Sequence, residues 1–170
     1  GHIADVGFDM YLRMVGEAVA NYRGEETEEE PPMRIEIPVD ANLPEDYISS
    51  ERLRLEMYKQ IAEIRSREDI EETRAELADR YGPLPEQAEN LLAVSRLRNL
   101  CRSLGIQEII SQGKNIRFSP VDLPESRELR LQRLYPGSVV KRANQQILVP
   151  KPAEDALDWA TSLVEQIFAA

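Results

Sequence analysis

The sequence has few of the residues from which catalytic and metal sites are usually built. Its 170 residues include one cysteine, Cys101, and one histidine, His2. A single cysteine excludes an internal disulfide and is typical of a reducing compartment, so we expect a cytoplasmic protein. A zinc site or a Ser-His-Asp or Cys-His catalytic arrangement would have to depend on His2 at the chain end. We therefore expect no catalytic and no metal-binding residues.

Phosphate-binding loops and long hydrophobic runs are also missing. The eight glycines form no G-x-G-x-x-G or G-x-x-x-x-G-K motif, so no nucleotide-binding loop is visible. The longest uncharged run, 143–150, is far shorter than the roughly 20 apolar residues of a membrane-spanning helix. We expect no cofactor, no membrane contact and no enzymatic activity of this chain alone.

Basic charge is scarce: 21 Lys and Arg stand against 31 Asp and Glu, a net charge of −10. Neutralising DNA phosphates requires clustered basic side chains, so the balance argues against direct nucleic-acid binding. The acidity belongs to the first half of the chain, since residues 81–170 carry ten acids and eleven bases.

Composition divides the chain into three segments. Residues 1–24 carry apolar side chains at steps of three and four, which predicts an amphipathic helix. Residues 25–32 contain five glutamates and end in Pro-Pro, which predicts a solvated acidic linker. Residues 33–170 form the remaining domain. It opens with an alternating strand over 33–39, and Pro38 predicts either an edge position for that strand or its end.

The elements of this domain predict an α+β fold. Three amphipathic helices are expected over about 50–66, 68–81 and 85–104, the first with Ser50 as its N-cap. Two antiparallel hairpins follow, at 106–118 and 138–149, with a short helix over 127–134 between them. A closing helix after Pro152 carries an apolar stripe of Leu157, Ala160, Thr161, Val164 and Phe168. Helices and strands thus occur in separate runs, as in α+β proteins. The order is a strand, a three-helix segment, two hairpins and a closing C-terminal helix.

Four acids on one face of the second helix form what we call the acidic stripe: Glu68, Glu72, Glu76 and Asp79. At 100° per residue they fall within an arc of about 80°. The stripe lies opposite the inward-facing Ile70 and Leu77, and Arg65, Arg74 and Arg80 are near enough to pair with some of its members. One interpretation is a solvated helix face. The other is a docking surface for a basic partner, which the single sign of the stripe favours, because isolated surface ion pairs add little to folding.

Several separated motifs resemble one bacterial family. The chain begins GHIADVGFDMY and continues with IPVDANLPEDYI at 37–48, RLRLEMYKQIA at 52–62, ELADRYGPLP at 76–85 and AVSRLR at 93–98. In this order they resemble the end of the translocase module and the C-terminal domain of transcription-repair coupling factors. The resemblance is close to about residue 110 and looser beyond it.

This resemblance implies a function. Members of the family are ATP-driven DNA translocases that push on stalled RNA polymerase and recruit the excision-repair protein UvrA, and their ATPase motifs lie upstream of the region matched here. The resemblance implies that residues 1–24 are the tail of the translocase module. It also implies that 33–170 is a regulatory domain that docks on, and masks, the protein's own UvrA-binding module. UvrA and RNA polymerase would then be indirect partners.

The resemblance also implies docking residues. The acidic positions of a Glu-Leu-x-Asp-Arg motif face the UvrA-binding module in the family, which carries over to Glu76 and Asp79. Arg80 from the same motif and Glu72 from the acidic stripe complete our candidate interdomain docking set. The alternative is a docking module for an external protein, such as RNA polymerase or another repair factor.

Overall fold

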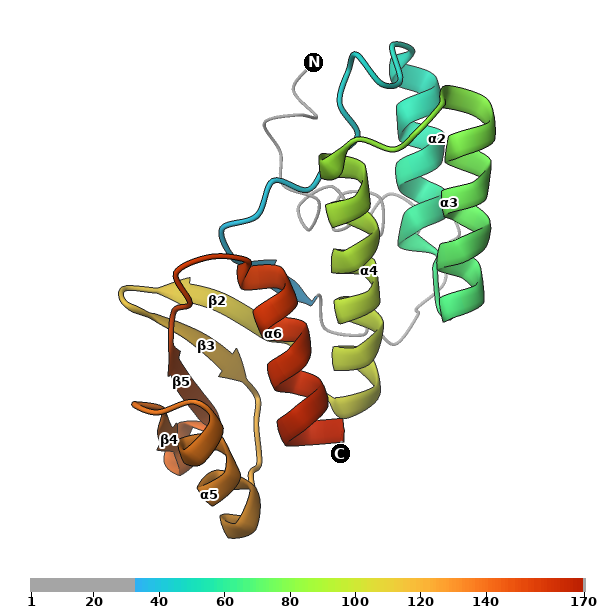
Figure 1. The fold of residues 1–170 in the computed structure, drawn as a ribbon. Helices are drawn as coiled ribbons and strands as arrows, with labels where there is room; N and C mark the ends of the chain where they lie inside the picture. Colours follow the sequence, from blue (N-terminus) through green and yellow to red (C-terminus); the bar gives the residue numbers. More distant parts are fainter. Residues whose placement is uncertain (1–32, 170) are drawn as a thin grey trace, which may run out of the picture. The chain divides into compact units, whose positions relative to one another are not determined.

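A computed structural model describes residues 33–169, which hold five α-helices and one five-stranded mixed sheet (Figure 1). The α+β class predicted from the sequence is confirmed. The helix expected over 1–24 and the linker expected over 25–32 lie outside the described residues. The described chain forms two compact units: a helical unit, 40–99, and a sheet unit that combines 33–39 with 100–169. Among residues 33–169, no helix is both long enough and apolar enough to cross a bilayer.

The helical unit contains α2 (Glu51–Ala62), α3 (Arg67–Tyr81) and the first part of α4 (Glu86–Leu104). Ser50 is the N-cap of α2, as predicted, and its hydroxyl accepts a hydrogen bond from the backbone N–H of Leu53 at 3.3 Å. The expected end of this helix at Ser66 is wrong. Ser66 is instead the N-cap of α3 and accepts from the N–H of Asp69 at 3.1 Å, because a serine side chain stabilises a helix start better than a helix interior.

The face of α3 opposite the acidic stripe is buried as predicted, with Leu77 fully buried and Ile70 6% exposed. Gly82 ends the helix at a φ of +89°, a value that favours glycine because it has no Cβ. Thr73 is also buried, and its hydroxyl accepts from the side-chain amide of Gln60 on α2 at 3.4 Å. Figure 1 shows α2 and α3 side by side, so Thr73 marks the flank of α3 that faces α2.

Buried tyrosine and arginine side chains fasten the segment before α2. The Tyr58 hydroxyl, in a side chain only 3% exposed, accepts from the N–H of Leu43 at 2.8 Å. The guanidinium of Arg54 is buried and donates to the carbonyl oxygen of Ile48 at 2.7 Å. The sequence pattern predicted neither contact, because both join a helix to an irregular segment.

The sheet unit has the strand order β1-β2-β3-β5-β4. The strands are β1 (Arg34–Glu36), β2 (Glu108–Gln112), β3 (Asn115–Ser119), β4 (Val139–Lys141) and β5 (Gln146–Pro150). Both predicted hairpins are confirmed, since β2 pairs antiparallel with β3 and β4 pairs antiparallel with β5. The first strand lies at the sheet edge and also ends before Pro38, so both interpretations of that proline hold, but at Arg34–Glu36 the strand is shorter than the expected 33–39. Its parallel pairing with β2 joins segments more than 70 residues apart.

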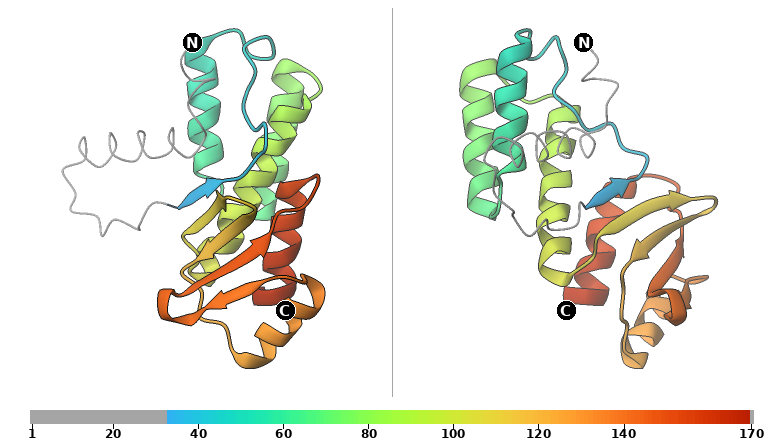
Figure 2. Two further views of the ribbon diagram at one scale, coloured as in Figure 1. Left: turned by 90° about the vertical axis from the view of Figure 1, so that its left-hand side faces the viewer. Right: turned by 180° about the vertical axis from the view of Figure 1, so that it is seen from behind.

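One face of the sheet is apolar and packs on α6 (Ala156–Val164). Ile109, Ile116, Phe118 and Ile147 on this face are fully buried. The Phe118 and Trp159 ring centroids lie 6.1 Å apart, which places α6 on this face. Figure 2 shows α6 (red) on one side of the strands, and no helix of residues 33–169 covers the other face of the sheet.

The final helix differs from the prediction in which row of side chains it buries. Leu157, Ala160 and Val164 are buried as expected, but Phe168 is half-buried while Leu163 and Ile167 are buried. Two neighbouring rows of this helix are apolar, so periodicity alone could not choose between them. After Val164 the chain continues as a π-helical turn, Glu165–Ala169.

The last residues of α4 differ in burial. Cys101 is fully buried, whereas Leu104 is 36% exposed. Gly105, at a φ of +77°, ends the helix as predicted. The N–H of the buried Ile106 then donates to the carbonyl oxygen of Cys101 at 3.0 Å, which closes the last turn.

Candidate functional site

The predicted docking residues lie on α3 and on its outer side. Glu68, Glu72 and Asp79 are exposed, and Glu76 is half-buried. Arg80, also exposed, follows at the edge of the same face, about 40° beyond Glu76 at 100° per residue. The structure therefore brings Glu72, Glu76, Asp79 and Arg80 onto one continuous side of a single helix.

The arginines around the acidic stripe bind elsewhere, so the expectation that they could pair with it is wrong. Arg74 lies on the flank that faces α4 and contacts Glu71 at 2.5 Å and Glu89 at 3.1 Å. These partners raise the pKa of the Arg74 guanidinium, with the hydrogen bond to Glu71 as the largest cause. Arg65 donates to the carbonyl oxygens of Ala62 and Ile64.

Within residues 33–169, the four carboxylates of the acidic stripe consequently make no ion pair. Arg65 and Arg74 are held by partners outside the stripe. A row of like charges is mildly repulsive along a helix, so the stripe contributes nothing favourable to this fold through charge pairing. Its charge is available to a partner.

Glu76 has an unusual environment for a surface acid. Its Oε2 is buried and has no hydrogen-bond partner among the described residues. About 60° around the helix lies Thr73, which contacts α2, so Glu76 sits where the acidic stripe meets α2. A buried carboxylate oxygen without a donor costs free energy.

Arg80 is held in place beside the two acids of its motif. Its guanidinium carbon lies 5.1 Å from the centre of the Tyr81 ring, a cation–π arrangement, and Nη1 lies 4.0 Å from the sulfur of Met57. Neither contact neutralises its charge. The candidate surface therefore presents a row of carboxylates bordered by one positioned cation.

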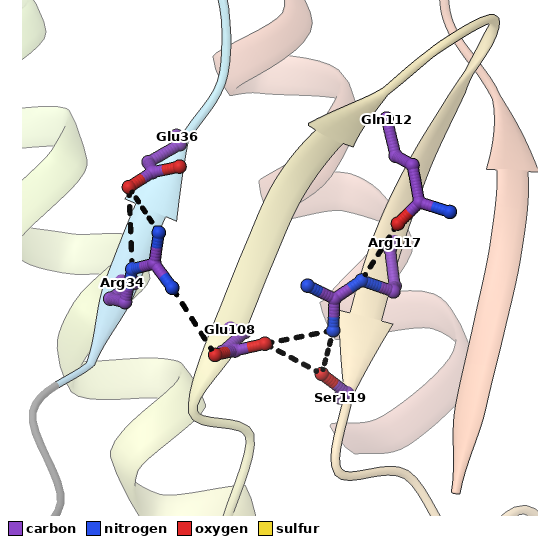
Figure 3. A network of polar contacts seen from close by, with 6 residues as sticks. All are labelled: Arg34, Glu36, Glu108, Gln112, Arg117 and Ser119. Atoms are coloured by element: carbon purple, nitrogen blue, oxygen red, sulfur yellow. Dashed lines mark hydrogen bonds and ion pairs between the residues drawn. The ribbon is translucent and has the colours of Figure 1, made fainter. Parts of the chain in front are cut away.

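A second polar cluster lies on the open face of the sheet (Figure 3). The sequence pattern did not predict it. Glu108 on β2 contacts Arg117 on β3 at 2.8 Å and Arg34 on β1 at 3.7 Å. The hydrogen bond from Arg117 lowers the pKa of Glu108. Because these charges satisfy one another across three strands, the cluster joins β1 to the sheet and offers no free charge for docking. Only the pairing of β1 with β2 could have revealed it.

The described residues offer no assembly typical of a catalytic centre. Between residues 33 and 169, no group of three or more His, Cys, Asp or Glu side chains could hold a metal ion. Cys101, the one cysteine, is fully buried within the fold. No catalytic domain is evident in this part of the chain, and the acidic stripe remains its candidate functional site.

Comparison with known proteins gives the family. A model described as the TRCF domain matches residues 37–128, a little over half of the chain, and this range includes α3. The chain belongs to the transcription-repair-coupling factor family. The family predicted from the sequence motifs is thereby confirmed, and the chain is a domain of a protein of transcription-coupled DNA repair.

Curated relatives in this family are much longer than the chain. Transcription-repair-coupling factors of Mycobacterium bovis and Mycobacterium tuberculosis are 45% identical over 169 residues, covering 92% of this chain and 14% of each relative. That of Staphylococcus epidermidis is 35% identical over 120 residues, covering 69% of this chain and 10% of the relative. The chain thus spans about one seventh of the length of its mycobacterial relatives.

A solved structure shares the fold. The crystal structure of the C-terminal domain of a transcription-repair coupling factor superposes with a TM-score of 0.65 at 20% sequence identity. The match covers 78% of this chain and 88% of that chain. The α+β arrangement is therefore that of a known C-terminal domain of the family.

Proposed function

We propose that this domain is an autoinhibitory module of a transcription-repair coupling factor. In this proposal it docks on the UvrA-binding module of the same protein and masks it until repair begins. The parent acts as an ATP-dependent DNA translocase, and its ATPase motifs lie outside this chain. The docking residues are Glu72, Glu76, Asp79 and Arg80 on α3.

The observation that supports this proposal is the unpaired state of the acidic stripe. Arg74, the cation nearest to the middle of α3, is directed to Glu71 and Glu89, which leaves the stripe without a counter-charge. The family resemblance selects Glu76 and Asp79 independently of this geometry. A basic surface on the UvrA-binding module would complement the exposed carboxylates of the stripe.

A weak interface is sufficient for this role. Keeping the site covered for about 99% of the time requires only about 2.7 kcal/mol between the closed and open states. Because both modules belong to one chain, their effective concentration is on the order of millimolar. An intrinsic Kd of about 10 μM, which corresponds to about 6.8 kcal/mol, would therefore keep the module closed.

The test is a charge reversal in the full parent protein. Glu76→Arg combined with Asp79→Arg replaces attraction by repulsion at the proposed interface and should raise UvrA binding. Removing one member of a buried charge pair costs about 2–5 kcal/mol, a range that includes the free energy of about 2.7 kcal/mol that closure needs, and reversing two charges costs more. Unchanged UvrA affinity in a folded variant would contradict the proposal.

A matched control comes from two exposed loop acids outside α3. Asp122→Arg combined with Glu154→Arg makes the same change in net charge at residues that form no ion pair within 33–169. This variant should bind UvrA like the unmodified parent. If it also raised UvrA binding, net charge rather than the acidic stripe would be the cause.

The alternative function is docking of an external protein. Masking of the UvrA-binding module would then be a secondary role. The two are separated by mixing this chain with the isolated UvrA-binding module and, separately, with RNA polymerase, each at low and high salt. Salt-sensitive association with the UvrA-binding module supports autoinhibition, because screened ion pairs weaken as salt rises. Association with polymerase alone would favour the alternative.

A further inference from the structure

A basic segment stands out in the sheet unit of this acidic chain. Residues 125–142 contain five basic and two acidic side chains, although the whole chain carries a net charge of −10. The segment includes α5 (Glu125–Leu134) and β4. Such a local reversal of sign requires a separate explanation from the acidic stripe, which lies in the other compact unit.

Part of this basic charge holds the fold together. Arg127 donates to the carbonyl oxygens of Ile167 and Phe168 at 2.9 and 2.6 Å, which joins α5 to the end of the closing helix. Arg142 pairs with Glu128 and donates to a loop carbonyl oxygen at 2.7 Å. Removal of either arginine would therefore disturb folding.

Two other arginines have no such role. Arg130 and Arg133 are exposed and make no ion pair or side-chain hydrogen bond among the described residues. With their neighbours they form what we call the α5 outer face: Ser126, Leu129, Arg130, Arg133 and Leu134. At 100° per residue these five fall within about 140°, on the side away from the fully buried Leu131, and none is acidic.

The leucines of this face are unusually exposed. Leu129 is 64% exposed and Leu134 is 41% exposed, and they are two of only four large hydrophobic side chains exposed within residues 33–169. Leu129 and Arg133 are one helical turn apart, as are Arg130 and Leu134. Each apolar side chain thus has a cationic neighbour on the same surface. Burying such leucines against a partner is favourable, whereas the fold leaves them in water.

We propose that the α5 outer face is a docking surface for an acidic protein segment that also presents apolar side chains. The two free arginines match carboxylates, and the two exposed leucines, at the two edges of this face, match apolar side chains on either side of those carboxylates. A DNA phosphate backbone would use the arginines and leave both leucines in water. A bilayer is a poor match for a ten-residue helix whose outer face is half cationic. The observations therefore favour a protein partner.

The test measures binding to this 170-residue chain by NMR. The probe is a short amphipathic helical peptide of leucine and glutamate, with the leucines at i, i+3 and i+4 spacing, and its matched control carries lysine in place of every glutamate. We expect the glutamate peptide to shift the resonances of α5, with an affinity that falls as salt rises. The lysine peptide should leave them unchanged.

Three variants decide whether the α5 outer face is responsible. Arg130→Glu combined with Arg133→Glu should weaken glutamate-peptide binding on the order of tenfold or more, and Leu129→Ser should weaken it without changing its salt dependence. Lys114→Glu combined with Lys151→Glu makes the same charge change at exposed residues outside α5 and should have little effect.

Several outcomes would overturn the proposal. They are the absence of α5 shifts at millimolar glutamate peptide, equal weakening by the control double variant, and binding of short duplex DNA or phosphatidylglycerol vesicles through Arg130 and Arg133 in place of the peptide. Leu129 is exposed, so Leu129→Ser is expected to fold normally, and it keeps the test decisive if the double charge reversal fails to fold.

Discussion

The Arg74 guanidinium lies 3.1 Å from the Glu89 carboxylate, which directs the arginine of α3 toward α4 and away from the acidic stripe. The contact includes a second hydrogen bond, which Nε of Arg74 donates to the Glu89 carboxylate at 3.2 Å. One side of α3 therefore uses its charge to hold the helical unit together, and the opposite side leaves its charge unpaired. This division separates the structural acids of the helix from the acids proposed to dock.

The Arg74–Glu89 pair should couple measurably in folding. Both side chains are partly exposed, at 35% and 44%, so solvent screens the attraction. A double-mutant cycle with Arg74→Ala and Glu89→Ala should give a coupling free energy of about 0.5–1 kcal/mol, measured by urea unfolding. The same cycle on Arg52 and Glu56, which are 76% and 54% exposed, should give less. Equal coupling in both cycles would contradict the structural role assigned to Arg74.

Tyr58→Phe should destabilise the protein by about 1–3 kcal/mol. The substitution removes the hydroxyl that accepts the N–H of Leu43 at 2.8 Å and leaves that buried donor unsatisfied. Urea unfolding of the variant measures the loss. The control is Tyr135→Phe, whose hydroxyl donates to Gln166 at 2.8 Å in an exposed setting, where water can replace it. A cost for Tyr58→Phe no larger than that of the control would show that Tyr58 does not fasten the segment before α2.

Stability should fall in acid partly through Glu108. The hydrogen bond from Arg117 lowers the pKa of Glu108 in the folded protein, so the unfolded chain binds protons more readily there. The contribution of this carboxylate is therefore present above the unfolded pKa of about 4.3, and it is lost as the pH falls through the lower folded value.

Glu108→Gln is the variant that checks this dependence. It should lower stability at neutral pH and reduce the slope of unfolding free energy against pH below about pH 4.3, measured by urea unfolding at a series of pH values. Glu154→Gln, at an exposed acid outside any ion pair of the described chain, is the control and should leave the slope unchanged. Identical acid slopes in the Glu108→Gln variant and the unmodified chain would rule out this assignment.

Local chemistry accounts for the elements that could be predicted. The alternating segments around Gly113 form the expected hairpin because their side chains interact over a few residues. Ser50 caps α2 for an equally local reason. Ser66 shows the limit, since it was placed at the end of one helix and instead begins the next. The boundary between two adjacent helices depends on which serine side chain accepts a hydrogen bond from a backbone N–H in the first turn of the next helix. The periodicity of apolar residues does not report that hydrogen bond.

The candidate site was predictable to a similar degree. Helical spacing alone placed Glu72, Glu76 and Asp79 on one face. It did not show that Arg74 is drawn to Glu89, 15 residues away, or that Oε2 of Glu76 is buried without a donor. Both facts come from the packing of α3 against its neighbours, which helical periodicity does not report.

The sequence by itself determined the α+β class, the family, the two hairpins and the row of acids on α3. Each of these features depends only on local residue spacing or on contiguous motifs. Tertiary structure alone decided the parallel pairing of β1 with β2, the buried row of the closing helix and the partner of every arginine near the acidic stripe. These features depend on which distant segments meet. A charge on a helix surface is neutralised or left free according to the side chains that folding brings beside it.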